Sequence, residues 1–102
     1  MTIEIQKENE SVIVKMIGIL DTGAADQIET DIQEIESLAN KKITIDCSRL
    51  EYISSSGLRH FLRIRKAADA YNHTVVLTGV NDNIKEVLKI THFDSIFDIR
   101  QS

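Results

Sequence analysis

The sequence predicts a single α/β domain in which helices pack on a mixed sheet of four to five strands. Segments with a period of two, typical of strands, alternate along the chain with segments whose apolar residues recur every three to four positions, as in helices. Only a short turn joins the first two strand-like segments, whereas helix-like segments separate the later ones. This order favours an antiparallel hairpin followed by strand–helix–strand connections.

Length and composition fit one domain that spans residues 1–102. The chain is 42% hydrophobic and 27% charged, has no proline, and shows no Gly/Ser-rich linker. Its net charge of −4 argues against nucleic acid or an anionic membrane as the main partner. No apolar run approaches the ~20 residues of a membrane span, so membrane insertion is not expected. The one cysteine excludes an intrachain disulfide and fits a reduced cytoplasmic setting.

The first half of the chain predicts three strands and one helix. Residues 2–6 alternate, and residues 11–20 are rich in β-branched side chains, so these two segments form the hairpin. Residues 21–40 change to a helical period, with acids between the isoleucines. Residues 41–50 alternate again and predict a strand.

The second half predicts a helix over residues 57–73, a buried strand over 74–80, and a helix over 81–93 capped by Asn81 or Asp82. The last residues, 94–102, fit either a helix or an edge strand. The predicted order is therefore β-β-α-β-α-β-α with an apolar tail. Six of the apolar residues at these spacings are expected in the core: Ile28, Ile32, Ile45, Leu62, Val76 and Leu88.

Three consecutive serines, residues 54–56, stand before Gly57 at the junction of a predicted strand and a predicted helix. The simplest interpretation makes Ser55 or Ser56 the helix N-cap, worth ~1 kcal/mol relative to alanine. One cap does not require three serines. At a strand end and a helix start, however, unpaired N–H groups can also hold a phosphate, which would add about −1.5 to −2 charges to a docking surface.

A serine hydrolase is a weaker interpretation of the same stretch. The nucleophile turn of such enzymes is Gly-x-Ser-x-Gly, and Ile53 stands where its first glycine would be. A nucleophilic serine also needs a base with an orienting acid. His60 lies one turn into the predicted helix with no evident acid, and His73 and His92 lie beside other elements.

Three stretches resemble the STAS domain of the anti-sigma factor antagonist type. GILDTGAAD, residues 18–26, is similar to the Gly-x-Leu-Asp loop and the alanine that opens the first helix. ITIDCSRLEYISSSGL, residues 43–58, is similar to the central strand and the Asp-Ser-Ser/Ala-Gly-Leu motif. VVLTGVNDNIKEVLKITHFDSIFDI, residues 75–99, is similar to the closing strand, helix and Phe-x-x-Ile-Phe tail. The resemblance thus runs almost from end to end.

The resemblance implies a non-enzymatic binding module without a cofactor, in which Ser55 is the phosphorylation site. The unphosphorylated form would bind an anti-sigma factor that is also a serine kinase and so release a sigma factor. Phosphorylation would reverse this, and a PP2C-type phosphatase would restore the active form. The surface that the resemblance implies for partner binding includes Asp21, Ser54, Ser56, Gly57 and Arg59.

The chain departs from the family pattern at one position, because Ser54 stands where aspartate usually precedes the acceptor. A phosphate on Ser55 would meet less repulsion, but recognition by a kinase through that carboxylate would be lost. Ser54 or Ser56 could then be the acceptor. A STAS scaffold or transporter-complex subunit that is never phosphorylated is the alternative function, and a small serine hydrolase the third.

Other residues that could carry chemistry favour plainer roles. Cys47 alternates in phase with the apolar residues of its strand and is expected in the core. Asp21, Asp26 and Asp46 are scattered, so solvated loop acids are a better interpretation than a metal site. Asp46, near the end of its strand, could border the site or cap a loop. No Gly-rich phosphate-binding loop is present to support a nucleotide hydrolase.

Overall fold

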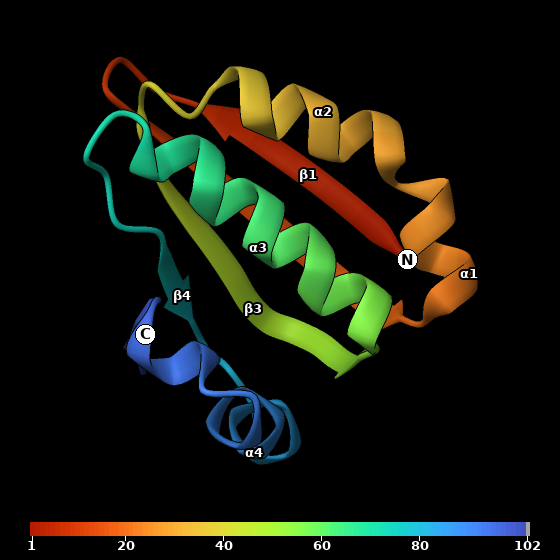
Figure 1. Cartoon of the computed structure of the whole chain (residues 1–102). Coiled ribbons are helices and arrows are strands. Elements are labelled where there is room, and N and C mark those ends of the chain that lie inside the picture. The colour runs from red at the N-terminus through yellow and green to blue at the C-terminus, as the bar shows by residue number, and fades with distance from the viewer. Residues whose placement is uncertain (102) are drawn as a thin grey trace.

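The computed structural model describes residues 1–101 and shows a five-stranded mixed sheet with helices (Figure 1). In chain order the elements are β1 (Thr2–Lys7), β2 (Ser11–Leu20), α1 (Thr22–Gln27), α2 (Glu29–Ser37), β3 (Lys42–Ile53), α3 (Ser55–Asp69), β4 (Val76–Thr78), α4 (Asp82–Ile90), a 3-10 turn (Phe93–Ser95) and β5 (Asp98–Arg100). The predicted α/β class, opening hairpin and mixed sheet are confirmed. Among residues 1–101, no helix has the length and apolar character needed to cross a bilayer.

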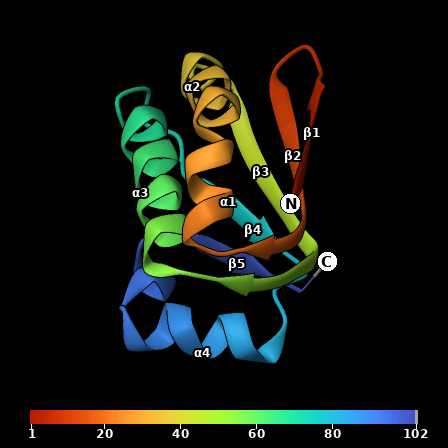
Figure 2. The same cartoon turned by 90° about the vertical axis from the view of Figure 1, so that its right-hand side faces the viewer.

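The strands lie in the sheet in the order in which they occur along the chain. β1 pairs antiparallel with β2, and β2, β3, β4 and β5 run parallel. Parallel crossovers are almost always right-handed, so a sheet that grows in one direction receives its crossover helices on one face. Figure 2 shows α1, α2 and α3 together on that face, while α4 lies across the end of the sheet where α1 and α3 begin.

Several predicted elements differ from the observed ones. The strand expected over residues 74–80 is only Val76–Thr78, and the helix expected over residues 57–73 is Ser55–Asp69. The single helix expected over residues 21–40 is two helices, because the backbone turns at Ile28, with φ −95° and ψ 11°. This turn lets the alanines of α1 and the isoleucines of α2 all face the core. β3 continues three residues further than predicted, since shifts in its register with β2 disrupt the simple alternation. The undecided last segment contains a 3-10 turn followed by an edge strand.

The core lies between the sheet and α1–α3 and extends under α4, and it contains four of the six predicted residues: Ile28, Ile32, Ile45 and Leu88. The prediction was wrong for Leu62 and Val76, which are only half-buried. On α3 the buried face includes Phe61 and Ile64, so Leu62 lies on the side of the helix and not on its buried face. In β4, Leu77 is fully buried, so its neighbour Val76 points to the face that carries no helices.

Phe61 should contribute far more to stability than its neighbour Leu62. The Phe61 side chain is fully buried and meets the ring of Phe97 edge-on, with 6.2 Å between the ring centroids. We expect Phe61→Ala to lower the free energy of unfolding by ~3–5 kcal/mol, and Leu62→Ala to lower it by less than about 1.5 kcal/mol. Urea unfolding of both variants measures the difference. Equal losses would contradict the observed orientation of α3.

Candidate functional site

The candidate site lies at the carboxyl ends of the parallel strands β2 and β3, where α1 and α3 begin (Figure 2). Leu20 and Ile53 are paired residues at these strand ends, and the Ser54 N–H donates to the Leu20 carbonyl oxygen at 2.9 Å. Asp21 and Ser54 therefore occupy equivalent positions, each directly between a strand and a helix. The structure thus brings together two stretches that the sequence analysis treated as one surface.

Both junction residues cap their helices. A carboxylate oxygen of Asp21, Oδ1, accepts from the Ala24 N–H at 2.8 Å, and Ser54 Oγ accepts from the Gly57 N–H at 3.1 Å. The prediction that Ser55 or Ser56 is the cap was therefore wrong, and Ser54 is the cap. Its side chain is buried, at 9% exposure. Serine and aspartate are both strong N-caps, so a serine at this position maintains the local structure without a charge.

The three serines have different environments as a result. Ser55 is the first residue of α3 and is exposed, whereas Ser56 is half-buried. Ser56 lies beside a hollow of about 220 Å³ that it shares with acidic and basic side chains: Asp26, Glu29, Arg59 and Arg63. Arg59 is exposed and follows Ser55 by four residues, so it lies on the same face of α3 one turn later.

Gly57 lets α3 approach the strand ends closely. A Cβ atom at this position would lie 2.8 Å from Cγ of Leu20 and 2.9 Å from Cγ1 of Ile53, closer than side chains normally pack. Gly57 is buried, and its N–H is occupied by Ser54. Gly57 and Ser54 thus form the base of the site, and the exposed residues above them are Asp21, Ser55 and Arg59.

Two contacts hold α1 and α2 against α3 beside the site, and they were not predicted from the sequence. His60 is buried on α3, and its Nε2 lies 2.8 Å from the Ala25 carbonyl oxygen of α1. Arg63, one turn further, donates two hydrogen bonds to Glu29 and two to Glu36, both on α2. The seven-residue spacing of these glutamates was a possible signal, because it places them on one helix face.

The Arg63 cluster shifts the pKa values of its members. Hydrogen bonds from Arg63 lower the pKa of Glu29, and the hydrogen bonds to Glu29 and Glu36 raise the pKa of Arg63. The Arg63 side chain is 32% exposed and the Glu29 side chain 42%, so water screens much of this attraction. The cluster therefore orients α2 against α3 rather than preparing a group for catalysis.

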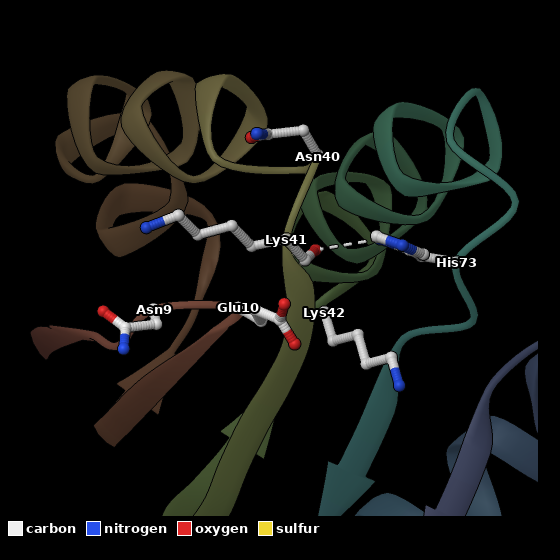
Figure 3. A pocket seen from close by; sticks show the side chains of 6 residues that line it. All are labelled: Asn9, Glu10, Asn40, Lys41, Lys42 and His73. Atoms are coloured by element: carbon white, nitrogen blue, oxygen red, sulfur yellow. Dashed lines mark hydrogen bonds between the residues drawn. The ribbon is translucent and has the colours of Figure 1, made fainter.

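The histidines are not arranged as a base for the serines. The Ala25 carbonyl can only accept, so Nε2 of His60 donates to it. The remaining ring nitrogen, Nδ1, lies 3.4 Å from Nη1 of Arg63 and faces that donor rather than a serine. His73 lies at the opposite end of the sheet, beside a polar hollow of about 310 Å³ lined by Glu10, Lys42 and neighbouring residues (Figure 3). There its Nδ1 is 3.1 Å from the Lys41 carbonyl oxygen.

The remaining polar candidates have structural roles. Cys47 is buried, as predicted, and burial raises the pKa of its thiol to about 12, so it stays protonated at neutral pH. Asp46, within β3, accepts from the Ser48 N–H at 2.9 Å, and its hydrogen bonds with Ser48 lower the pKa of that carboxyl. Within residues 1–101, no group of three His, Cys, Asp or Glu side chains is placed to hold a metal ion.

The chain is similar to known proteins both in sequence and in fold. The STAS domain model matches residues 2–102. A Bordetella bronchiseptica protein named "Putative anti-sigma factor antagonist BtrV" is 28% identical over 102 residues, which cover all of this chain and 88% of the relative.

Three solved structures have the same fold. An anti-sigma factor antagonist from Mycobacterium paratuberculosis has a TM-score of 0.86 at 17% identity, covering 99% of this chain and 86% of that one. The Bacillus cell fate determinant SpoIIAA in its phosphorylated form has 0.73 at 18%, covering 99% and 93%. A sulfate transporter family protein from Wolinella succinogenes has 0.68 at 20%, covering 84% and 70%.

Ser54, and not Ser55, should carry the capping energy. We expect Ser54→Ala to lower the free energy of unfolding by ~1 kcal/mol, because the Gly57 N–H loses its acceptor. Ser55→Ala should change it by less than about 0.5 kcal/mol, since that side chain is exposed. Ser54→Asp, which restores an acceptor, is the control and should unfold near the wild-type urea midpoint. Equal losses for the two alanine variants would contradict this assignment.

The contact between Arg63 and Glu29 should make stability depend on acid pH. Because the folded-state pKa of Glu29 lies below its ordinary 4.5, this stabilisation is present above 4.5 and is lost as the pH falls through the folded value. The urea midpoint of wild type should therefore exceed that of Arg63→Gln at about pH 7, and the gap should shrink at about pH 3. Arg65→Gln is the control, since Arg65 makes no ion pair in the described part of the chain. A gap that does not change with pH would refute the role of Glu29.

Proposed function

Because the chain belongs to the STAS domain family, we propose that it is an anti-sigma factor antagonist controlled by phosphorylation of Ser55. In this proposal the unphosphorylated surface binds an anti-sigma factor with serine kinase activity and thereby releases a sigma factor. The observation that carries the proposal is the exposed Ser55 at the first position of α3, beside the capped start of α1. The name of the Bordetella relative supports the same function.

Among the three serines, the environment of Ser55 favours it as the acceptor. Ser54 is buried, and its hydroxyl oxygen accepts from the Gly57 N–H, so a kinase would have to disrupt the cap to reach it. Ser56 is half-buried in a hollow that it shares with charged side chains of both signs, so it is less accessible to a kinase than the exposed Ser55. Ser55 has neither restriction.

The position of Ser55 also explains how a phosphate could change binding without unfolding the domain. The first N–H groups of a helix have no acceptor within the helix, and the positive end of its dipole favours an anion there. Arg59, one turn later, has no ion pair among residues 1–101 and can reach toward a phosphate on Ser55. The phosphate would add about two negative charges to the surface while these groups stabilise it.

The proposed partner surface consists of exposed residues from both helix starts. Asp21 comes from the end of β2, and Ser55 and Arg59 come from α3, with half-buried Ser56 between them. Ser54 and Gly57 support this surface from below. A binding module of this kind needs no cofactor, and a PP2C-type phosphatase would reverse the modification. Such partners would place the protein in the cytoplasm.

A STAS scaffold or transporter-complex subunit that is never phosphorylated is the second candidate function. Its support is the transporter family structure with the same fold, together with the absence of a carboxylate at residue 54. A serine hydrolase has less support, because Nε2 of His60 donates to Ala25 and its Nδ1 faces Arg63. Mass spectrometry of protein from its native cell separates the first two functions, since only the antagonist should carry a phosphate on Ser55.

Binding of the anti-sigma factor should respond to charge at Ser55. We expect Ser55→Ala to bind the kinase-type anti-sigma factor of the same cell like wild type in titration calorimetry, because the neutral surface is maintained. Ser55→Asp should bind at least about tenfold more weakly, since a like-charge contact at an interface can cost several kcal/mol. Added salt should recover only the screened part of this loss.

Asn40→Asp is the matched control, because it introduces the same side chain at an exposed position at the opposite end of the sheet (Figure 3). It should bind like wild type. If wild type, Ser55→Ala and Ser55→Asp all have the same affinity, the switch is refuted and the scaffold function takes its place.

A further inference from the structure

We propose that the groove between the end of β3 and α4 binds a basic amphipathic helix of a protein partner. This groove has a volume of about 260 Å³ and is lined by Glu51, Tyr52 and Ile53 from β3 and by Asn83, Ile84 and Val87 from α4. Its lining is mostly apolar apart from one carboxylate and one amide. Such a volume is smaller than most ligand pockets, and it suits one or two side chains that project from a helix.

An exposed apolar strip extends the groove on both sides. We define this strip as the exposed Ile19, Tyr52 and Ile90 together with the half-buried Val87. Ile19 and Tyr52 are paired residues of β2 and β3 and are 50% and 52% exposed, while Ile90 is 69% exposed. Val87 and Ile90 are three residues apart and lie on one flank of α4. A continuous row of large apolar side chains in water is the usual mark of a surface that a partner covers.

The charges beside the groove indicate a basic partner. Glu51 lines the groove, and Glu86 is exposed three residues after Asn83 and four before Ile90, so it lies on the same flank of α4. The lysines of this helix, Lys85 and Lys89, are four residues apart from each other and fall on the opposite flank. A partner helix with a row of apolar side chains bordered by lysine or arginine therefore complements both the apolar strip and the acids beside it, Glu51 and Glu86.

The groove adjoins the proposed switch along the chain. Tyr52 and Ile53 immediately precede the serine stretch, and Ile19 precedes Asp21 by two residues. Ser55 follows the groove residue Ile53 by two positions, so a partner that reads the switch could use both surfaces. The assignment of this helix to the partner that reads the switch rests on the proposed function. The chemistry of the groove does not depend on phosphorylation.

The test uses two labelled helical peptides with the same row of leucines, one bordered by lysines and the other by glutamates. In fluorescence anisotropy we expect the lysine peptide to bind more tightly than the glutamate peptide. The double variant Glu51→Gln/Glu86→Gln should weaken binding of the lysine peptide by about 2- to 30-fold, the range for two exposed charge contacts. Ile90→Asp should weaken it by about tenfold, and amide NMR shifts should map the contact to Tyr52, Asn83 and Val87.

Matched controls are Glu4→Gln, an exposed acid on β1, and Tyr71→Asp, an apolar residue that is 56% exposed after α3. Both should bind the lysine peptide like wild type, and urea unfolding checks that each variant is folded. Equal binding of the two peptides, or no effect of Ile90→Asp, would overturn the proposal. A concentration-dependent dimer that Ile90→Asp abolishes would also overturn it and assign the strip to a second copy of the chain.

These outcomes are separable from a failure of the proposed function. A protein that binds the lysine peptide but responds to no charge at Ser55 would contradict only the switch. A protein that loses its anti-sigma factor in Ser55→Asp but does not bind the peptide would contradict only the groove.

Discussion

The site depends on the hydrogen bond that joins the ends of two parallel strands, from the Ser54 N–H to the Leu20 carbonyl oxygen. This bond places the residues after each strand side by side, so α1 and α3 start together. Gly57 then lets α3 lie against Leu20 and Ile53 at a distance that a side chain would prevent. A serine at the start of α3 therefore faces the same surface as the loop after β2, although more than thirty residues separate them in the sequence.

The one-directional order of the sheet explains why this surface is near one end of the molecule. Right-handed crossovers place α1, α2 and α3 on one face. Because β2 and β3 run parallel, the helices that follow them begin at the same end of the sheet. α4 lies across that end and forms the groove with β3. Functional candidates gather there because helix starts, exposed strand ends and a short helix meet at one place.

Sequence patterns predicted the sheet, the hairpin and the junction of a strand and a helix at the three serines, but not the details that depend on neighbouring elements. Three adjacent serines have the same tendency to cap, and the pairing of Ile53 with Leu20 decides that Ser54 is the cap. Phe61 and Leu62 both fit a helical apolar stripe, and only the packing of α3 distinguishes them. The hydrogen bonds of Arg63 to α2 could not be predicted from a local pattern, because their prediction requires knowing which helices lie side by side.

The separation of cap and candidate acceptor is what would allow a switch on a folded domain. If one hydroxyl performed both roles, a phosphate on it would rearrange the first turn of α3 and alter stability together with binding. Here Ser54 holds the turn from inside and Ser55 is exposed to solvent one residue later. A charge added at Ser55 meets the favourable end of the helix and a nearby arginine, so the fold tolerates it. Its main effect is therefore on whatever binds the surface.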